Sequence, residues 1–98
     1  MHISKNEVLQ QLKHTGKLFT ELFSHGSLAV EIYRPKHKDL QTPHERDEVY
    51  IIISGEADFY NDGTVVHAAA GDLLFVAAGK EHHFENFTND FATWAVFF

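Results

Sequence analysis

The chain has 98 residues, no cysteine, and 14 acidic against 8 basic residues, which gives a formal net charge of −6. This length suffices for one domain with a modest core, and the negative charge argues against a nucleic-acid or membrane partner, since both are polyanionic. The lack of cysteine excludes disulfides, thiolate zinc sites and cysteine nucleophiles. No apolar run approaches the roughly 18 residues of a membrane span, and no signal-peptide core is present, so we expect a cytoplasmic protein.

The first 16 residues predict one short helix. Ser4 and Glu7 have the spacing of a capping box, in which the two side chains satisfy free backbone amides at a helix start. Val8 and Leu12 follow at helical spacing, and Gly16 is a plausible end of the helix. We expect this helix to pack on the edge of the core and to carry no chemistry.

From Lys17 onward the apolar period changes to two, and short strand-like runs are separated by turn residues. The expected strands are residues 17–23, 27–33, 48–53, 56–60, 64–69, 73–77, 82–87 and 91–98. The turns contain pairs such as Asp62-Gly63, which suit a tight hairpin because glycine tolerates positive φ. About eight short strands predict an all-β antiparallel sandwich or barrel.

Two segments place metal-binding side chains near the start of a strand. His44 and Glu48 flank residues 45–47, and they can converge only if these three polar residues bend, since four residues of straight strand span about 13 Å. Alternation in the second segment lets His82 face inward while His83 faces the other side. Two imidazoles and one carboxylate form a ligand set that leaves open positions for water or substrate. The alternative is an ordinary surface ion pair between His44 and Glu48.

The second segment resembles the second conserved motif of the cupin family. That motif consists of a glycine, five residues, a proline, one residue, a glycine, two residues, a histidine, three residues and an asparagine. The chain has Gly71, Gly79, His82 and Asn86 at these spacings, and only the proline differs, because Ala77 occupies its position.

The first segment resembles the first cupin motif. That motif pairs two alternating histidines with a glutamate, followed by six residues and a glycine. His44, Glu48 and Gly55 occupy the second histidine, the glutamate and the glycine, while Thr42 stands in place of the first histidine. Gln41 could supply an amide oxygen as a fourth ligand in its stead, or water could fill the position.

The resemblance implies a double-stranded β-helix of the RmlC-like type, a jelly roll whose barrel spans residues 27–98. Residues 1–26 would form a helix and an edge strand packed on that barrel within one domain. It further implies that His44, Glu48 and His82 hold a divalent metal ion, such as iron, manganese, nickel or zinc, at the barrel mouth.

We expect a pocket for a small, partly apolar organic ligand beside that ion. The candidate lining residues are Thr42, Tyr50, Ile52, Phe75, Phe84 and Trp94. The possible functions include a metal-dependent oxygenase, isomerase or decarboxylase, a non-catalytic small-molecule sensor, and a degenerate metal-free cupin. Serine-nucleophile elbows, phosphate-binding glycine loops and zinc-protease helices are absent from the sequence. We also expect a homodimer, with Val49, Ile51 and Ile53 facing a second layer or another subunit.

Overall fold

A computed structural model describes all residues, 1–98, and begins with one helix, α1 (Lys5–Thr15). The Ser4 side chain caps the helix by accepting a 3.5 Å hydrogen bond from the Glu7 amide. Gly16 ends it in the left-handed conformation (φ 72°), from which its amide donates to the Leu12 carbonyl. The helix predicted from the sequence is therefore confirmed. No helix of this structure has both the length and the apolar character needed to span a membrane.

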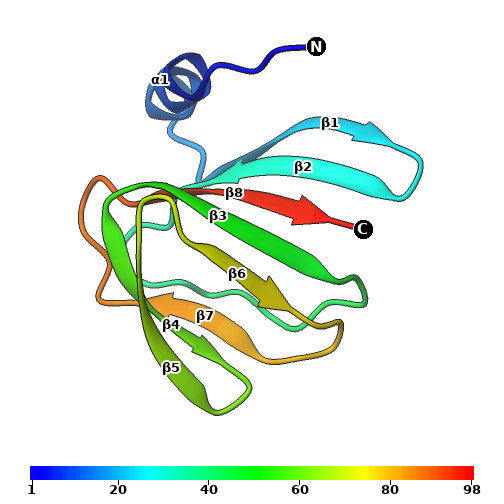
Figure 1. Cartoon of the computed structure of the whole chain (residues 1–98). Helices are drawn as coiled ribbons and strands as arrows, with labels where there is room; N and C mark the ends of the chain where they lie inside the picture. The colour runs from blue at the N-terminus through cyan, green and yellow to red at the C-terminus, as the bar shows by residue number, and fades with distance from the viewer.

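Eight strands follow, and together with α1 they give the all-β architecture expected from the sequence. The strands are β1 (Phe19–His25), β2 (Leu28–Tyr33), β3 (Glu48–Ser54), β4 (Glu56–Asn61), β5 (Thr64–Ala69), β6 (Leu73–Val76), β7 (His82–Glu85) and β8 (Ala92–Phe97). They form a five-stranded sheet, in the order β1-β2-β8-β3-β6, and a three-stranded sheet, in the order β5-β4-β7 (Figure 1). All pairings are antiparallel, as a jelly roll requires.

The space between the two sheets is filled by aromatic side chains. Tyr50 from β3 lies edge-on to Phe59 and Phe84 of the smaller sheet, with ring centroids 5.6 Å and 4.9 Å away. All three residues are fully buried. The core consists of Tyr50, Ile52, Ala57, Phe59, Ala68, Val76, Phe84, Phe91 and Ala95. In so small a barrel, these rings occupy much of the interior and confine open space to its mouth.

The other face of the five-stranded sheet is partly covered by α1 (Figure 1). Val8 and Leu12 of the helix form a second small core with Ile32, and Trp94 packs against it. Trp94 therefore lies outside the barrel, and the prediction that it lines the pocket is wrong. The same holds for Phe75, which is 52% exposed on the outer face of β6. Both errors have one cause: strands β6 and β8 are apolar on both faces, so alternation could not tell inside from outside.

The long connection between β2 and β3 ties the two sheets together at one end of the barrel. Its Asp39 is buried and accepts hydrogen bonds from the Tyr33 hydroxyl, from the backbone and side-chain amides of Gln41, and from the Phe84 amide of β7. A carboxylate without these donors would be costly to bury. This residue holds the connection across the barrel mouth, directly before the segment that carries His44.

Candidate metal centre

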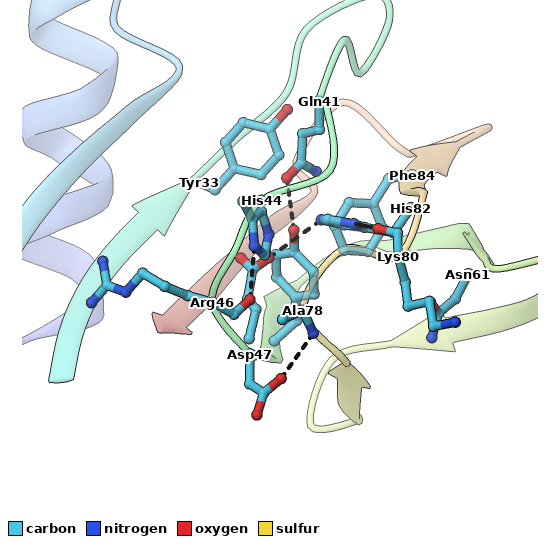
Figure 2. A network of polar contacts seen from close by, with 12 residues as sticks. Tyr33, Gln41, His44, Arg46, Asp47, Asn61, Ala78, Lys80, His82 and Phe84 are labelled. Carbon is cyan, nitrogen blue, oxygen red and sulfur yellow. Dashed lines mark hydrogen bonds and ion pairs between the residues drawn. The ribbon is translucent and has the colours of Figure 1, made fainter. Parts of the chain in front are cut away.

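The two histidine-containing segments meet in space, as the sequence analysis predicted. The Gly79 amide donates a 2.7 Å hydrogen bond to the carbonyl of His44. Next to it, the Ala78 amide donates a 2.8 Å hydrogen bond to Oδ1 of Asp47 (Figure 2). These two bonds fix the loop before β7 against the loop before β3, so the side chains that follow are held at a defined separation.

A bend brings His44 and Glu48 together. The chain bends at residues 45–46, and β3 begins only at Glu48. The bend turns the Arg46 carbonyl toward the His44 ring, whose Nδ1 lies 2.8 Å from that oxygen. The polar residues between the two candidate ligands therefore make the turn that the sequence analysis required.

The three predicted ligands converge on one point, and Figure 2 shows the rings of two of them, His44 and His82, close together. Nε2 of His44 lies 2.8 Å from Oε1 of Glu48, and Nε2 of His82 lies 3.3 Å from the same oxygen. One ligand atom from each residue lies within 4.8 Å of the other two. The His82 and Glu48 side chains are almost fully buried, whereas 26% of the His44 side chain is exposed. The site therefore lies at the edge of the core and opens on the side of His44.

Backbone carbonyls determine which nitrogen of each imidazole is free. Nδ1 of His82 lies 2.9 Å from the Lys80 carbonyl, as Nδ1 of His44 does from that of Arg46. A carbonyl only accepts, so both Nδ1 atoms carry the proton and donate. In the neutral form, both Nε2 atoms then present a lone pair to the carboxylate of Glu48. Metal-binding histidines are commonly oriented by such hydrogen bonds.

His82 Nε2 is a buried polar atom without a hydrogen-bond partner. Although Oε1 of Glu48 is 3.3 Å away, the geometry of this contact is not that of a hydrogen bond. Burial lowers the pKa of His82, but Glu48 and the Lys80 carbonyl outweigh burial, and the net effect is to raise that pKa. Such an environment favours a cation next to Glu48, either a proton or a metal ion. Two atoms bound to one ion at about 2.1 Å lie about 3.0–3.4 Å apart, a spacing that the 3.3 Å separation of His82 and Glu48 matches, whereas the 2.8 Å separation of His44 and Glu48 is shorter.

A cavity of about 400 Å³ is lined by Glu48, one of the three candidate ligands. Its walls are mostly apolar, and its polar members include Glu48 itself. The lining residues are Leu18, Phe19, Glu31, Tyr33, Lys38, Leu40, Gln41, Glu48, Ala95 and Phe97. Ligand pockets of small molecules have this size and this mixture of apolar walls with a few polar groups.

The pocket residues predicted from the sequence differ from this lining. Tyr50, Ile52 and Phe84 do face the barrel interior, but they are buried in the core, and Thr42 is exposed at the surface. Gln41 does line the cavity. Its amide oxygen accepts a 2.8 Å hydrogen bond from the Tyr50 hydroxyl, so as a fourth ligand it would have to share that oxygen.

Sequence reasoning missed several residues of the cavity. Glu31 is the one charged residue of β2, and its pairing with Ala95 places it on the inner face of the sheet. A single charged residue in an otherwise apolar strand could have indicated that Glu31 belongs to the cavity. Leu18 and Leu40 had no signal, because they come from separate connections that only the fold brings to the barrel mouth.

Two of the histidines outside the site, His67 and His83, contact acidic residues. His67 contacts Asp58 (2.9 Å) and Glu56 (3.2 Å) through its two different nitrogens, on the exposed face of the three-stranded sheet. His83 contacts Glu85 there, on the exterior as expected. The structure contains a single group of histidine and acidic residues whose ligand atoms converge, formed by His44, Glu48 and His82.

Comparison with known proteins gives a consistent family assignment. A family model described as a cupin domain matches residues 29–98. An uncharacterized protein of Streptomyces coelicolor, SCO3923, is 36% identical over 59 residues, which cover 60% of this chain and 56% of that relative. The chain thus matches little more than half the length of this relative.

Two solved structures share the fold. One is described as a predicted oxalate decarboxylase from Thermotoga maritima, with 27% identity, a TM-score of 0.64, and coverage of 81% of this chain and 76% of that one. The other is described as a putative mannose-6-phosphate isomerase from Ralstonia eutropha, with 21% identity, a TM-score of 0.67, and coverage of 81% of each chain.

Proposed function

The chain belongs to the cupin domain family, and from this premise we propose that it binds a divalent metal ion through His44, Glu48 and His82. The metal-bound site would accept a small organic ligand from the adjoining cavity. Two imidazoles and one carboxylate suit iron, manganese, nickel or zinc, and they leave coordination positions open. When bound, such an ion supplies Lewis acidity or a binding point for dioxygen.

One observation carries this proposal: both imidazoles present Nε2 to the same carboxylate oxygen. The Arg46 and Lys80 carbonyls hold the rings in that orientation, and the two loops are joined by the bond from the Gly79 amide to the His44 carbonyl. The buried Nε2 of His82 lacks any hydrogen-bond partner, so an ion would satisfy an atom that is otherwise left unpaired. A surface ion pair of His44 and Glu48 would not explain the unpaired His82.

The residues around the position of the proposed metal ion have distinct roles. Glu48 supplies the negative charge, and burial of its carboxylate strengthens its attraction for a cation. His44, the partly exposed ligand, lies on the side from which the ion would enter. The Tyr50 hydroxyl donates to Gln41 beside the site, and burial raises the pKa of Tyr50, so this phenol stays protonated as a donor.

Metal analysis tests the proposal directly. We expect about one equivalent of zinc in protein that has been loaded with zinc and desalted. The variants His44→Ala, Glu48→Gln and His82→Ala should each lose most of this zinc. His83→Ala is a matched control, because it removes an imidazole from the exterior of the same strand, β7. Full metal occupancy in both histidine variants of the site would contradict the three-ligand model.

An enzyme would convert the bound ligand, whereas a non-catalytic binding protein would leave it unchanged. The relatives described as a decarboxylase and an isomerase support an enzyme, with metal-dependent decarboxylation or isomerisation as its reaction and oxygenation as the further alternative. Compounds extracted from the purified protein would be identified by mass spectrometry and incubated with iron- or manganese-loaded protein in air. Conversion would support the enzyme, whereas recovery of the unchanged compound would support a sensing or binding protein.

We also propose that the protein forms a homodimer through the outer face of β3 and β6. Ile51, Leu73 and Phe75 are adjacent on this face, because Ile51 pairs with Leu73 and Val49 with Phe75. All three are exposed, although α1 covers Ile53 nearby. An exposed apolar patch of this kind commonly marks a protein interface. The cytoplasmic location expected from the sequence stays a prediction.

A further inference from the structure

The carboxylate of Glu31 is the one acidic group of the cavity that the metal site does not use. It lies on β2 opposite Ala95 of β8, on the inner face of the sheet that also carries Glu48. It is about half-buried, and it makes no hydrogen bond or ion pair within the chain. The other acidic cavity residue, Glu48, is engaged by both site histidines.

The surroundings of Glu31 make an unpaired carboxylate there unfavourable. On the neighbouring strand β1, Glu21 lies directly opposite it, and like charges in that position destabilise a sheet. Burial raises the pKa of Glu31, the charges of Glu48 and Glu21 raise it further, and the charges of Arg46 and His44 offset this increase only in part. A cationic group placed in the cavity would relieve this unfavourable environment.

The other residues that line the cavity indicate which chemical group would carry such a cation. Leu18, Phe19 and Leu40 stand at the mouth with 39%, 56% and 76% of their surface exposed, and Phe97 adds an aromatic wall. These side chains would bury the apolar part of a ligand. A cavity of about 400 Å³ accommodates only a small molecule.

We propose that Glu31 makes this cavity selective for small apolar amines, with the primary ammonium group of the ligand bound to its carboxylate. The inference rests on the proposed function, because Glu48, one of the proposed metal ligands, lines this cavity. Lys38 is the one basic residue of the lining, and its side chain forms no ion pair with an acidic residue. It would compete weakly with the ligand for Glu31, since it is exposed to solvent.

The test uses 2-phenylethylamine as the probe and 3-phenylpropanoate, its anionic counterpart, as the comparison. Both are titrated at pH 7 into ¹⁵N-labelled protein, once loaded with zinc and once treated with a chelator, and affinity is read from amide chemical shifts. We expect the amine to bind more tightly than the acid in the chelator-treated protein, and Glu31→Gln to weaken amine binding about tenfold or more.

Two further variants separate the role of Glu31 from a general change of charge. Glu21→Gln removes the same charge from the facing strand without altering the cavity lining, so amine binding should fall less than threefold. Lys38→Met should leave amine binding unchanged or make it tighter, because it removes the competing cation.

The inference is overturned if the wild type does not bind the amine, if Glu31→Gln stays within twofold of the wild type, or if Glu21→Gln loses as much. Its failure is distinguishable from that of the proposed function. If zinc does not bind, the metal assignment is wrong, but the chelator-treated titrations still decide the role of Glu31. If zinc binds and these titrations fail, the metal site stands and the amine selectivity does not.

Discussion

Nε2 of His82 lies 3.3 Å from Oε1 of Glu48, and this buried nitrogen has no hydrogen-bond partner. The Lys80 carbonyl holds the Nδ1 proton on the opposite side of the ring. The pair therefore has room for one positive species, and a proton and a metal ion compete for it. This competition makes the site sensitive to pH in opposite senses with and without metal.

The first prediction concerns the pH dependence of zinc binding. Because the pKa of His82 is raised, its proton persists to higher pH than in a free imidazole, and zinc must displace it. Zinc affinity should fall about tenfold for each pH unit below that pKa for each proton displaced. Competition with a chelating dye between pH 8 and pH 5.5 measures this, and an affinity that does not change over this interval would contradict it.

The stability of the metal-free protein should depend on pH in the opposite direction from zinc affinity: it should fall, not rise, as the pH increases. A raised pKa in the folded state means that protonated His82 favours folding, so this contribution is fully present below the ordinary pKa of about 6.5. It is lost as the pH rises through the raised pKa. The corresponding loss should be absent from urea unfolding of His82→Ala, which provides the control.

The second prediction concerns Gly55, which follows β3 in a left-handed conformation at φ 70°. A Cβ atom there would lie 2.8 Å from Cα of Phe91, a backbone contact that cannot be relieved by rotating a side chain. Gly55→Ala should lower the free energy of unfolding by about 1–3 kcal/mol or more, as measured with urea. Gly63→Ala is the matched control: its φ is also positive (93°), but nothing lies within 4 Å of the added atom. Equal losses in the two variants would show that the close approach is unimportant.

The third prediction concerns the Asp39 carboxylate. Asp39→Ala would leave the buried amide of Phe84 and the Tyr33 hydroxyl without their acceptor, at about 1–3 kcal/mol for each group left unpaired. Because the connection also carries His44, zinc affinity should fall together with stability. Asp39→Asn keeps one acceptor oxygen and should have an intermediate effect.

The control for Asp39 is Asp62→Asn, which removes an exposed carboxylate that lies 3.5 Å from the Lys80 ammonium. An exposed pair of this kind contributes about 0–1 kcal/mol. Urea unfolding and zinc titration of the three variants should therefore separate Asp39 from Asp62. An Asp39→Ala protein with wild-type zinc affinity would show that the connection does not position the site.

The convergence of the three candidate ligands was predictable because the spacing of two motifs that resemble those of the cupin family places them together. The spacing of His44 and Glu48 required a bend, and a bend is what three polar residues before an apolar strand make. His82 followed from the resemblance to the second cupin motif, and alternation at the start of β7 allowed its side chain to face inward. The strand positions were also predictable, because glycine and asparagine or aspartate mark most turns.

The cavity could not be predicted in the same way. Phe75 and Trp94 were assigned to the wrong face because every neighbour along the strand is apolar or small, so that only cross-strand register distinguishes the faces. Leu18 and Leu40 line the same cavity as Glu31 only because the fold brings two separate connections, α1–β1 and β2–β3, to the barrel mouth. Such contacts depend on tertiary structure, and no periodicity in the sequence reports them.

The fourth prediction concerns the proposed dimer. Phe75→Glu would place a charge on the exposed outer face of β3 and β6, where a partner would have to bury it without compensation. We expect the wild type to be dimeric at about 100 µM by light scattering coupled to size exclusion, and the variant to be monomeric. Val65→Glu is the matched control, because Val65 is similarly exposed (57%) but lies on the other sheet, in β5. A monomeric wild type, or the same mass for both variants, would show that this face is not the interface.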